Sequence, residues 1–600
     1  MTRFIGVMIL LAGCGSGSSG TADLATPSDD MANVVTADMT ILAIQDLATP
    51  DLARPDLETP TFSVTPSGDT NTNIAPSSVQ TVNSGSMQAF TVTAALGYVV
   101  STTVGGTCPA GSFMGSVYTT GAIVGNCTVT FTSSIPPPWA ETDTSGAFTS
   151  AFNAVAIDSN GNVYAVGTIG GNGTYGFGNS VTATGGFSNG NNIVLVKYNS
   201  SGIAQWAQTV SSAAFTSTFN SVAVDSGGNI YAAGMVGNNS TYGFGNSITT
   251  SGGFSNGNNI LLVKYNSSGV AQWAQTVSSA SFTSSFNSVA VDTNGNIYAA
   301  GAVGNNSTYG FGNSITTSGG FSNGNNILLV KYNSLGVAQW ADTVGSATFT
   351  SVFNSIAVDG NGNIYAGGAV GNNTTYGFGN SVTTSGGFSN GNNILLVKYS
   401  SSGIAQWADT VSSASFTSVF NSVALDSSGN IYAAGAVGNN TTYGFGNSVT
   451  TSGGFSNGNN ILLVKYNSSG VAQWADTVAS ASFTSVFNSV VLDSGGNIYA
   501  AGAVGNNSTY GFGNSVTVAG AFSNGNNVLL VKYSSAGVAQ SAQTVSTGST
   551  VSSFSSVAID SAGVAYTAGT INGNGTYTFA TGITANGAFS NGANAVLVKY

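Results

Sequence analysis

Few residues of this 600-residue chain could carry out catalysis, and most of these recur at a fixed spacing. The chain contains no histidine, which removes the commonest general base and every Ser-His-Asp or Cys-His arrangement. Of its three cysteines, Cys14 follows an apolar run, whereas Cys108 and Cys127 lie nineteen positions apart. No histidine or second cysteine pair could complete a metal site. We therefore expect no metal and no cofactor. The spacing of Cys108 and Cys127 suggests a disulfide, which would place the protein in an oxidising compartment.

The cations of residues 139–600 are seven lysines, one in each copy of "LLVKY" or a close variant. Each lies between apolar neighbours, where an unpaired ammonium group would lose its charge. We predict that each lysine pairs with an aspartate or caps carbonyls within its own repeat. Amine catalysis repeated seven times is disfavoured. The lysines are Lys197, Lys264, Lys331, Lys398, Lys465, Lys532 and Lys599.

Acidic residues fall into a regular set and an irregular set. The regular aspartates, beginning at Asp158 and repeating every 67 residues, open turns such as "DSNGN". Calcium loops use alternating oxygen ligands and end on a bidentate acid. The third turn position varies here and no such acid follows, so we predict that these aspartates cap turns. The irregular acids lie in or beside "WAQT" or "WADT" segments: Glu141, Asp143, Asp342, Asp409 and Asp476.

Two aromatic series repeat with the same spacing. The first is tryptophan, which we predict to pack between neighbouring repeats, with sugar stacking as the alternative: Trp139, Trp206, Trp273, Trp340, Trp407 and Trp474, replaced by Ser541 in the remaining copy. The second is tyrosine in the long segment "GNNSTYGFGNSITTSGGFSNGNN". Asparagines and exposed aromatics suit sugars, but they equally suit turns and packing. This candidate ligand-binding ring is Tyr175, Tyr242, Tyr309, Tyr376, Tyr443, Tyr510 and Tyr577.

The elements that would position these residues are short strands. The segment "FNSVAVDTNGNIYAAG" recurs with its phenylalanine every 67 residues from Phe152 to Phe554, which makes seven copies without insertions. Each copy contains four strand-like runs, "FNSVAVD", "NIYAAGAV", "NILLVKY" and "VAQWADTV", and a Gly/Asn turn joins the first two. A β-solenoid coil uses far fewer residues. We predict an all-β, seven-bladed β-propeller over residues 136–600.

The segments "VAVDTNGNIYAAG" and "NILLVKYNSLGVAQWADTV" resemble the bacterial seven-bladed propeller repeat called SBBP. The resemblance covers roughly 465 residues, although this repeat has a longer middle segment. The repeat also predicts how the ring closes. Subtracting one period from Trp206 gives position 139, which is Trp139. "PPPWAETDT" should therefore supply the fourth strand beside "NAVLVKY", because open sheet edges are a liability.

The first thirteen residues have the pattern of an export signal, with Arg3 before the apolar run "FIGVMILLA". The tetrapeptide ending at Cys14 resembles the lipobox of bacterial lipoproteins. That resemblance implies that Cys14 carries fatty acid such as palmitate and anchors the chain to a membrane. Gly15 and Ser16 imply outer-membrane sorting. The alternative is an ordinary signal with an incidental cysteine. Residues 14–60 are acidic and contain spaced prolines, so we expect an extended tether.

Residues 61–135 alternate as strands should, in "QAFTVTA" and "CTVTFTSS". We predict a small β-domain. Its segments "GGTCPAGSFMGSVYTTGAI" and "NCTVTF" resemble the divergent internalin-type bacterial repeat, a spacer on surface proteins. The resemblance implies that Cys108 pairs with Cys127, which would stabilise the domain by about 3 kcal/mol. It implies a stalk or adhesion module without catalysis.

Charge limits the classes of partner. Charged residues make up 5% of the chain and the net charge is −12, so no basic face could bind nucleic acid. Catalysis needs locally distinct groups, yet copies two to six are nearly interchangeable and the irregular acids lie on outer strands. We therefore predict a monomeric, non-enzymatic surface lipoprotein that binds or scaffolds a glycan or a surface protein. The alternatives are a polysaccharide lyase or hydrolase, or a purely structural surface protein.

Overall fold

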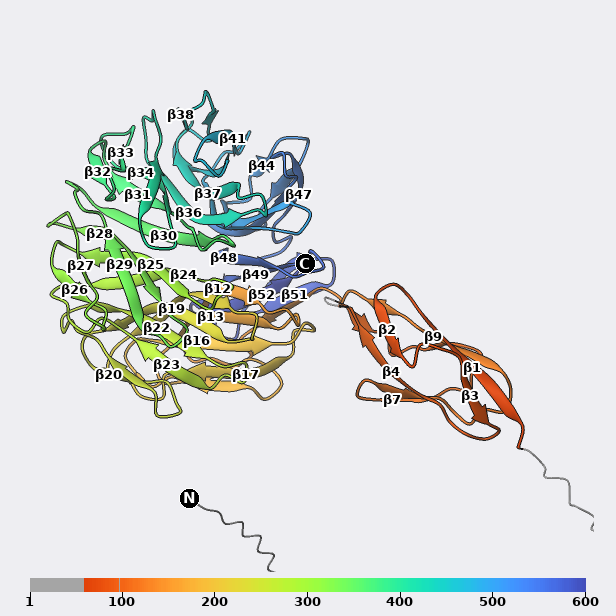
Figure 1. The fold of residues 1–600 in the computed structure, drawn as a ribbon. Coiled ribbons are helices and arrows are strands. Elements are labelled where there is room, and N and C mark those ends of the chain that lie inside the picture. The colour runs from red at the N-terminus through yellow and green to blue at the C-terminus, as the bar shows by residue number, and fades with distance from the viewer. Residues whose placement is uncertain (1–58, 96–97) are drawn as a thin grey trace, which may run out of the picture. The chain divides into compact units, whose positions relative to one another are not determined.

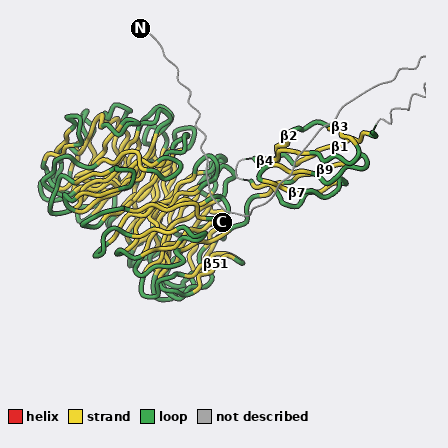
Figure 2. Tube along the Cα trace, turned by 90° about the horizontal axis from the view of Figure 1, so that it is seen from below, coloured by secondary structure: helices red, strands yellow, loops and turns green. Residues whose placement is uncertain are grey.

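The computed structural model describes residues 59–95 and 98–600. The predicted signal peptide, Cys14 and nearly all of the tether lie outside the described residues. Within the described part of the chain every regular element is a strand, as Figure 2 shows in yellow. No helix there is long and apolar enough to cross a membrane. The all-β prediction is therefore confirmed, and the 67-residue period appears as repeated four-stranded sheets.

The small β-domain is built from two four-stranded sheets, ordered β3-β1-β9-β6 and β2-β4-β8-β7, and a short β10-β5 pair. Strand β4 alternates exposed and buried positions, so its Phe90 and Val92 side chains enter the core with Val64 and Phe131. The strands are β1 (Thr61–Gly68), β2 (Thr72–Ala75), β3 (Gln80–Asn83), β4 (Ala89–Ala94), β5 (Val99–Val100), β6 (Gly105–Gly106), β7 (Ser112–Met114), β8 (Val117–Thr119), β9 (Cys127–Phe131) and β10 (Ser133–Ser134).

Residues 139–600 form seven antiparallel four-stranded sheets, which we call sheets 1 to 7 (Figure 1). The first strands, for sheets 1 to 7 in order, are β12 (Ser150–Ile157), β18 (Ser217–Val224), β24 (Ser284–Val291), β30 (Ser351–Val358), β36 (Ser418–Leu425), β42 (Ser485–Leu492) and β48 (Ser552–Ile559). The second strands are β13 (Val163–Gly170), β19 (Ile230–Gly237), β25 (Ile297–Gly304), β31 (Ile364–Gly371), β37 (Ile431–Gly438), β43 (Ile498–Gly505) and β49 (Ala565–Asn572).

The third strands are the "LLVKY" segments: β16 (Asn191–Tyr198), β22 (Asn258–Tyr265), β28 (Asn325–Tyr332), β34 (Asn392–Tyr399), β40 (Asn459–Tyr466), β46 (Asn526–Tyr533) and β52 (Ala593–Lys599). The fourth strands are β17 (Ala204–Thr209), β23 (Ala271–Gln275), β29 (Ala338–Thr343), β35 (Ala405–Asp409), β41 (Ala472–Thr477), β47 (Ala539–Gln543) and, in sheet 7, β11 (Trp139–Thr142). Strand β11 pairs with β52 and sets Trp139 opposite Lys599, so the predicted pairing of "PPPWAETDT" with "NAVLVKY" is confirmed.

The long segment between second and third strands carries a two-stranded hairpin in each copy, which the sequence did not lead us to expect. The hairpins are β14–β15 (Thr174–Gly176, Thr182–Thr184), β20–β21 (Thr241–Gly243, Thr249–Ser251), β26–β27 (Thr308–Gly310, Thr316–Ser318), β32–β33 (Thr375–Gly377, Thr383–Ser385), β38–β39 (Thr442–Gly444, Thr450–Ser452), β44–β45 (Thr509–Gly511, Thr517–Ala519) and β50–β51 (Thr576–Ala580, Ile583–Asn586).

The apolar core lies between sheets. Second and third strands are buried along nearly their whole length, as expected of continuous apolar runs covered on both faces. Seven apolar clusters each combine residues of two neighbouring sheets, and one of them joins Phe152 and Val163 of sheet 1 to Tyr566 and Leu597 of sheet 7. Strands β12 and β48 accordingly lie next to each other (Figure 1). Sheet 1 therefore packs on the last sheet as well as on sheet 2.

Side chains also bind the first strands to one another. The amide of Asn153 donates to the carbonyl of Phe219 in the next sheet at 2.8 Å, and five further copies repeat this bond. Between sheets 7 and 1 the corresponding residue is Ser555, but Ser556 Oγ accepts from the Val155 backbone N–H at 3.3 Å. Side-chain hydrogen bonds between neighbouring first strands therefore also occur where sheets 7 and 1 meet.

Candidate functional site

The tyrosines predicted to form an exposed ring are buried. All seven have a relative exposure of 0%, and the Tyr242 hydroxyl donates to the carbonyl of Gly237 at 2.6 Å. The same bond occurs in the other copies, in the last one to the Asn572 carbonyl at 2.7 Å. Each tyrosine thus anchors its hairpin to the end of the second strand. The prediction that Tyr175, Tyr242, Tyr309, Tyr376, Tyr443, Tyr510 and Tyr577 contact a ligand is wrong, because no ring face is open to solvent.

A different aromatic series is exposed. In six of the seven connections between a fourth strand and the next first strand, one phenylalanine is 40–47% exposed, a high value for so large an apolar side chain. We call this series the phenylalanine face: Phe148, Phe215, Phe282, Phe349, Phe416 and Phe483. Five of the six contact a second phenylalanine from the segment before the third strand. For Phe215 the partner is Phe187, with ring centroids 6.3 Å apart.

A buried asparagine holds each of these paired rings in place. Asn192, 0% exposed, accepts from the backbone N–H of Phe187 at 2.8 Å through its side-chain oxygen, and its side-chain nitrogen donates to the carbonyls of Gly171 and Phe187. Equivalent asparagines begin each third strand. Because a buried amide is costly to leave unpaired, the loop that carries Phe187 is fixed, and the partner ring is presented from a rigid support.

The phenylalanine face carries almost no charge. The loops that form it, represented by "GNNSTYGFGNSITTSGGFSNGNN" and "VSSASFTS", contain only Gly, Ser, Thr, Asn, Ala and apolar or aromatic residues. Asp143 precedes the first of these loops, but its side chain is 0% exposed and accepts from the Ser150 hydroxyl at 3.0 Å. The face therefore offers aromatic rings beside hydroxyl and amide groups, with no charged group to attract an ion.

The tryptophans lie between sheets. In the turn before β23, a methyl group at Gly269 would come within 2.9 Å of the Trp206 ring, so the indole packs directly on this glycine of the next sheet. All six tryptophans contact a glycine in this way, and Trp139 also donates from its indole N–H to the Ser200 carbonyl at 3.2 Å. The packing prediction for the tryptophans is confirmed. Each tryptophan is half-buried.

The lysines reach the same turns. Lys197 Nζ lies 5.3 Å from the ring centre of Tyr164 on the adjacent strand and donates to the Ser267 carbonyl of the next sheet at 3.3 Å. Four other lysines make the equivalent bond to a serine carbonyl: Lys264, Lys331, Lys398 and Lys599. The lysines do cap carbonyls, but the prediction that they do so within one repeat is wrong. The side chain is long enough to cross to the neighbouring sheet.

The regular aspartates cap turns as predicted. Asp158 accepts from the backbone N–H groups of Asn160 and Asn162, each at 2.9 Å, and from the Tyr164 hydroxyl at 2.9 Å. These bonds occupy both carboxylate oxygens, and the hydroxyl bond extends the capped turn to the second strand. Among the described residues no group of three or more His, Cys, Asp or Glu side chains is arranged to hold a metal ion.

The irregular acids Asp342, Asp409 and Asp476 lie in three different sheets, whereas Glu141 and Asp143 lie close together in and just after β11. Each of Glu141, Asp342, Asp409 and Asp476 lies on a fourth strand, next to the last tyrosine of the third strand in the neighbouring sheet. Burial raises the pKa of each of these carboxyls to about 7, and that of Asp143 to about 6. At the same position sheets 1, 2 and 6 carry Gln208, Gln275 and Gln543.

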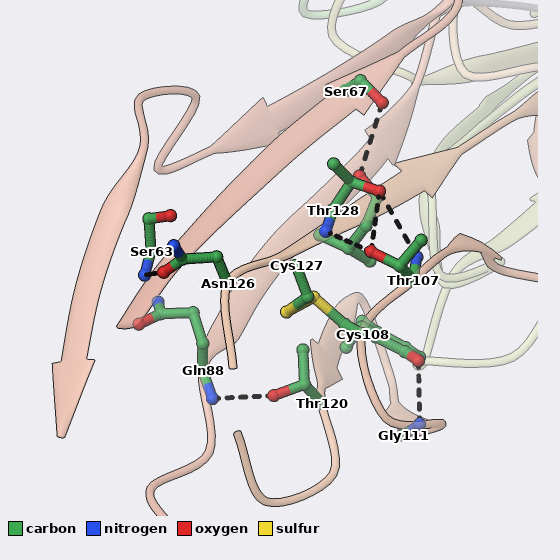
Figure 3. The surroundings of a disulfide bond; sticks show 12 residues. Ser63, Ser67, Gln88, Thr107, Cys108, Gly111, Thr120, Asn126, Cys127 and Thr128 are labelled. Carbon is green, nitrogen blue, oxygen red and sulfur yellow. Dashed lines mark hydrogen bonds between the residues drawn. A yellow bond between two sulfur atoms is a disulfide. The ribbon is translucent and has the colours of Figure 1, made fainter. Parts of the chain in front are cut away.

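Cys108 and Cys127 form a disulfide in the small β-domain, with their Cα atoms 4.8 Å apart (Figure 3). Polar bonds surround it: the Thr128 backbone N–H donates to the Thr107 hydroxyl at 3.0 Å, and the Gly111 N–H donates to the Tyr118 hydroxyl at 2.8 Å. The bridge ties the loop before β7 to the start of β9. The predicted pairing is confirmed, and its surroundings offer no catalytic group.

No family model matches the chain, and no curated protein matches it. The solved structures that are similar to it include the following three. A protein of unknown function from Dyadobacter fermentans is 9% identical over 77% of this chain and 98% of its own, with a TM-score of 0.36. The extracellular domain of a one component system from B. thetaiotaomicron is 9% identical over 77% of this chain and 82% of its own, with a TM-score of 0.20. The extracellular domain of a hybrid two component system from the same organism is 13% identical over 71% of this chain and 64% of its own, with a TM-score of 0.17.

Proposed function

We propose that the chain is a lipid-anchored cell-surface or outer-membrane protein whose seven sheets are the blades of a closed β-propeller. Its biochemical role is non-enzymatic, multivalent binding. The observation that carries the binding proposal is the phenylalanine face, six equivalent exposed rings at the same ends of six sheets. Equivalent weak sites on one rigid body give avidity when a ligand repeats the same unit.

Three observations support ring closure. The fourth strand of sheet 7 is β11, which precedes the first strand of sheet 1 in the chain. An apolar cluster joins sheets 7 and 1 in the way that other clusters join consecutive sheets. The Ser556 hydroxyl accepts from the Val155 N–H across the same junction. In a ring built in this way, β11 covers the edge of β52 that would otherwise be open.

The ligand class we propose is a neutral polysaccharide. Exposed aromatic rings can cover the apolar faces of sugar rings, and the Ser, Thr and Asn side chains around them can bond hydroxyl groups. The absence of charge from the loops of this face disfavours an anionic polymer. A protein ligand would contact the same surface, because contiguous exposed apolar groups mark interaction sites of both kinds.

A polysaccharide lyase or hydrolase is the competing function. Most glycoside hydrolases use two acids on either side of one bond. Among the acids with raised pKa, Asp342, Asp409 and Asp476 lie at separate sheet interfaces. Glu141 and Asp143 share the interface beside Tyr198, but Asp143 is 0% exposed and cannot reach a polysaccharide. This arrangement favours binding over hydrolysis. A purely structural surface protein would bind no soluble ligand at all, so the binding assay distinguishes a structural protein from a binding protein.

The test is a glycan array followed by titration of soluble neutral polysaccharides with the full chain. In the test variant all six residues of the phenylalanine face become threonine, the residue that occupies the seventh equivalent position as Thr550. The control variant converts to threonine six exposed aliphatic residues that precede the fourth strands, at the opposite ends of the same sheets: Ile203, Val270, Val337, Ile404, Val471 and Val538.

We expect the test variant to lose about 100-fold or more in apparent affinity, since avidity is lost at every site together. The control variant should bind as the unmodified chain does. Undiminished binding by the test variant would refute the proposal that the phenylalanine face binds the ligand. Release of sugar fragments would refute the non-enzymatic role. Separately, Cys14→Ser should move the chain from the detergent phase to the aqueous phase on phase separation. An unchanged partition would refute the lipid anchor.

A further inference from the structure

One asparagine in each of sheets 1 to 7 is exposed in the turn between the second strand and the hairpin, two residues after the second strand ends. Other asparagines of the repeat stabilise the fold: Asn220, Asn246 and Asn259 donate to backbone carbonyls. The side chain of Asn239 forms no such bond within residues 59–95 and 98–600. We call the series the turn asparagines: Asn172, Asn239, Asn306, Asn373, Asn440, Asn507 and Asn574.

The backbone of the turn does not require asparagine at these positions. The residue before each turn asparagine has a positive φ, for example 57° at Asn238, and in sheets 1 and 7 that residue is glycine. Asn239 itself does not have a positive φ. The residue after the turn asparagine varies among glycine, serine and threonine, yet the asparagine is present in all seven copies. Its exposed amide is therefore available to a ligand.

In sheet 1 the turn asparagine lies beside the phenylalanine face. A methyl group at Gly171 would come within 2.9 Å of the Phe148 ring, and one at Gly173 would come within 3.8 Å of it. These glycines are the two neighbours of Asn172 in the chain. The exposed ring and the exposed amide thus belong to one small area of the surface.

The same arrangement recurs in sheets 2 to 6. The glycine that ends the second strand packs on the exposed phenylalanine, as at Gly237, where a methyl group would come within 3.1 Å of Phe215 Cβ. Asn239 follows two residues later. In sheet 7 the residue beside Asn574 is Thr550 in place of the phenylalanine. Sheets 1 to 6 therefore present six equivalent pairs of an exposed ring and an exposed amide.

A ring and an amide side by side supply the two interactions that bind a sugar. The ring covers an apolar face of the sugar. The amide has one acceptor oxygen and two N–H donors, so it can bond two adjacent hydroxyl groups. The hairpin adds a pair of exposed hydroxyls close by, Thr241 Oγ1 and Ser251 Oγ, which lie 2.9 Å apart. All of these groups are uncharged.

We propose that each pair is one sugar-binding subsite, and that the turn asparagines of sheets 1 to 6 determine specificity for neutral sugars with adjacent free hydroxyl groups. The phenylalanine binds the apolar face of a sugar ring, and the asparagine selects among sugars by their hydroxyls. This inference rests on the proposed function, because it assigns the polar part of the same binding surface.

The probes are a soluble β-glucan, dextran, a mannan and a galactan, each with an O-methylated form whose methylated oxygens cannot donate. They are titrated against the full chain. In the test variant the six turn asparagines of sheets 1 to 6 become alanine. The control variant changes to alanine six exposed glutamines, which carry the same amide at the opposite ends of the same six sheets: Gln205, Gln272, Gln339, Gln406, Gln473 and Gln540.

We expect the unmodified chain to bind at least one polysaccharide about tenfold or more tightly than its O-methylated form, because each subsite loses a hydrogen bond. In the test variant the difference should fall to about twofold or less, whereas the control variant should keep it. The melting temperatures of all three chains should agree, since the amide of the turn asparagines has no partner within the described residues whose loss could destabilise the fold.

The outcomes separate this inference from the proposed function. If the test variant keeps the preference, or if the unmodified chain binds but shows none, the role of the asparagines is refuted, while the variant with threonine at the six phenylalanines still decides the phenylalanine face. Loss of the preference in the glutamine variant would also refute the asparagines, because the effect would not be local. Binding of none of the four polysaccharides would refute both proposals together.

Discussion

The buried acids predict an unusual dependence of stability on pH. Asp342, Asp409 and Asp476 lie at three successive interfaces, where burial raises the carboxyl pKa from 3.8 to about 7. One carboxylate oxygen of Asp342 and one of Asp409 are buried without a hydrogen-bond partner. The perturbation we propose is glutamine at all three positions, the residue that the chain itself uses in sheets 1, 2 and 6.

The sign follows from proton binding. Between pH 4 and pH 7 the folded state holds protons on these carboxyls that the unfolded state has released, so the free energy of unfolding decreases as pH rises. The stabilisation is complete below about pH 4 and lost once the pH has risen through about 7. A shift from 3.8 to about 7 corresponds to roughly 4 kcal/mol per carboxyl. Because buried sites relax and admit water, we expect about 2 to 4 kcal/mol for each.

The assay is thermal unfolding of the full chain from pH 4 to pH 8, followed by circular dichroism. For a repeat region of this size 1 kcal/mol changes the Tm by about 1 °C. At pH 8 the triple glutamine variant should therefore melt roughly 6 to 12 °C higher than the unmodified chain, and its advantage should shrink towards pH 4. The reverse substitution, Gln275→Asp, should destabilise the chain at pH 8 far more than at pH 4. Parallel pH profiles of the unmodified chain and the triple variant would refute the reasoning.

Three further predictions concern stability. Trp340→Ala should lower the free energy of unfolding by about 2 kcal/mol in urea denaturation, less than for a fully buried indole because Trp340 is half-buried. No change would mean that the glycine contact is incidental. Replacing Cys108 and Cys127 by serine should destabilise the small β-domain by about 3 kcal/mol, measured as the urea midpoint at which the amides of β1 and β9 lose protection from exchange, whereas an unchanged midpoint would refute a stabilising bridge. Deleting residues 136–145 should lower the Tm and speed amide exchange in β52, and unchanged exchange would contradict the pairing with β11.

The strands could be predicted because local chemistry determines them. The Asp158 side chain accepts from the backbone N–H of Asn160, two residues further along the chain, so this capped turn needs no distant partner. Continuous apolar runs in the third strands require burial on both faces. The pairing of Trp139 with Lys599 could also be predicted, because an exact period converts distance along the chain into an equivalent position.

Burial of individual aromatics could not be predicted from residue type. Tyr242 and Phe215 belong to similar polar surroundings, and only the folded hairpin shows that the first is buried and the second exposed. A comparison among the copies does contain a signal. The tyrosine is present in all seven, as core packing requires, whereas the exposed phenylalanine is replaced by Thr550 in the last. The reach of Lys197 to Ser267 depends on how sheets are placed beside one another, which no single repeat encodes.

The departures from the repeat are informative because they are not scattered. Ser541, Thr550 and Ser555 replace the tryptophan, the exposed phenylalanine and the asparagine of the other copies, and all three border sheet 7. Sheet 7 is also the one whose fourth strand comes from residues 139–142. In the other six sheets the fourth strand follows the third strand in the chain, whereas β11 comes from the opposite end of the repeat region and pairs with β52. The altered contacts therefore gather around the one sheet that a displaced strand completes.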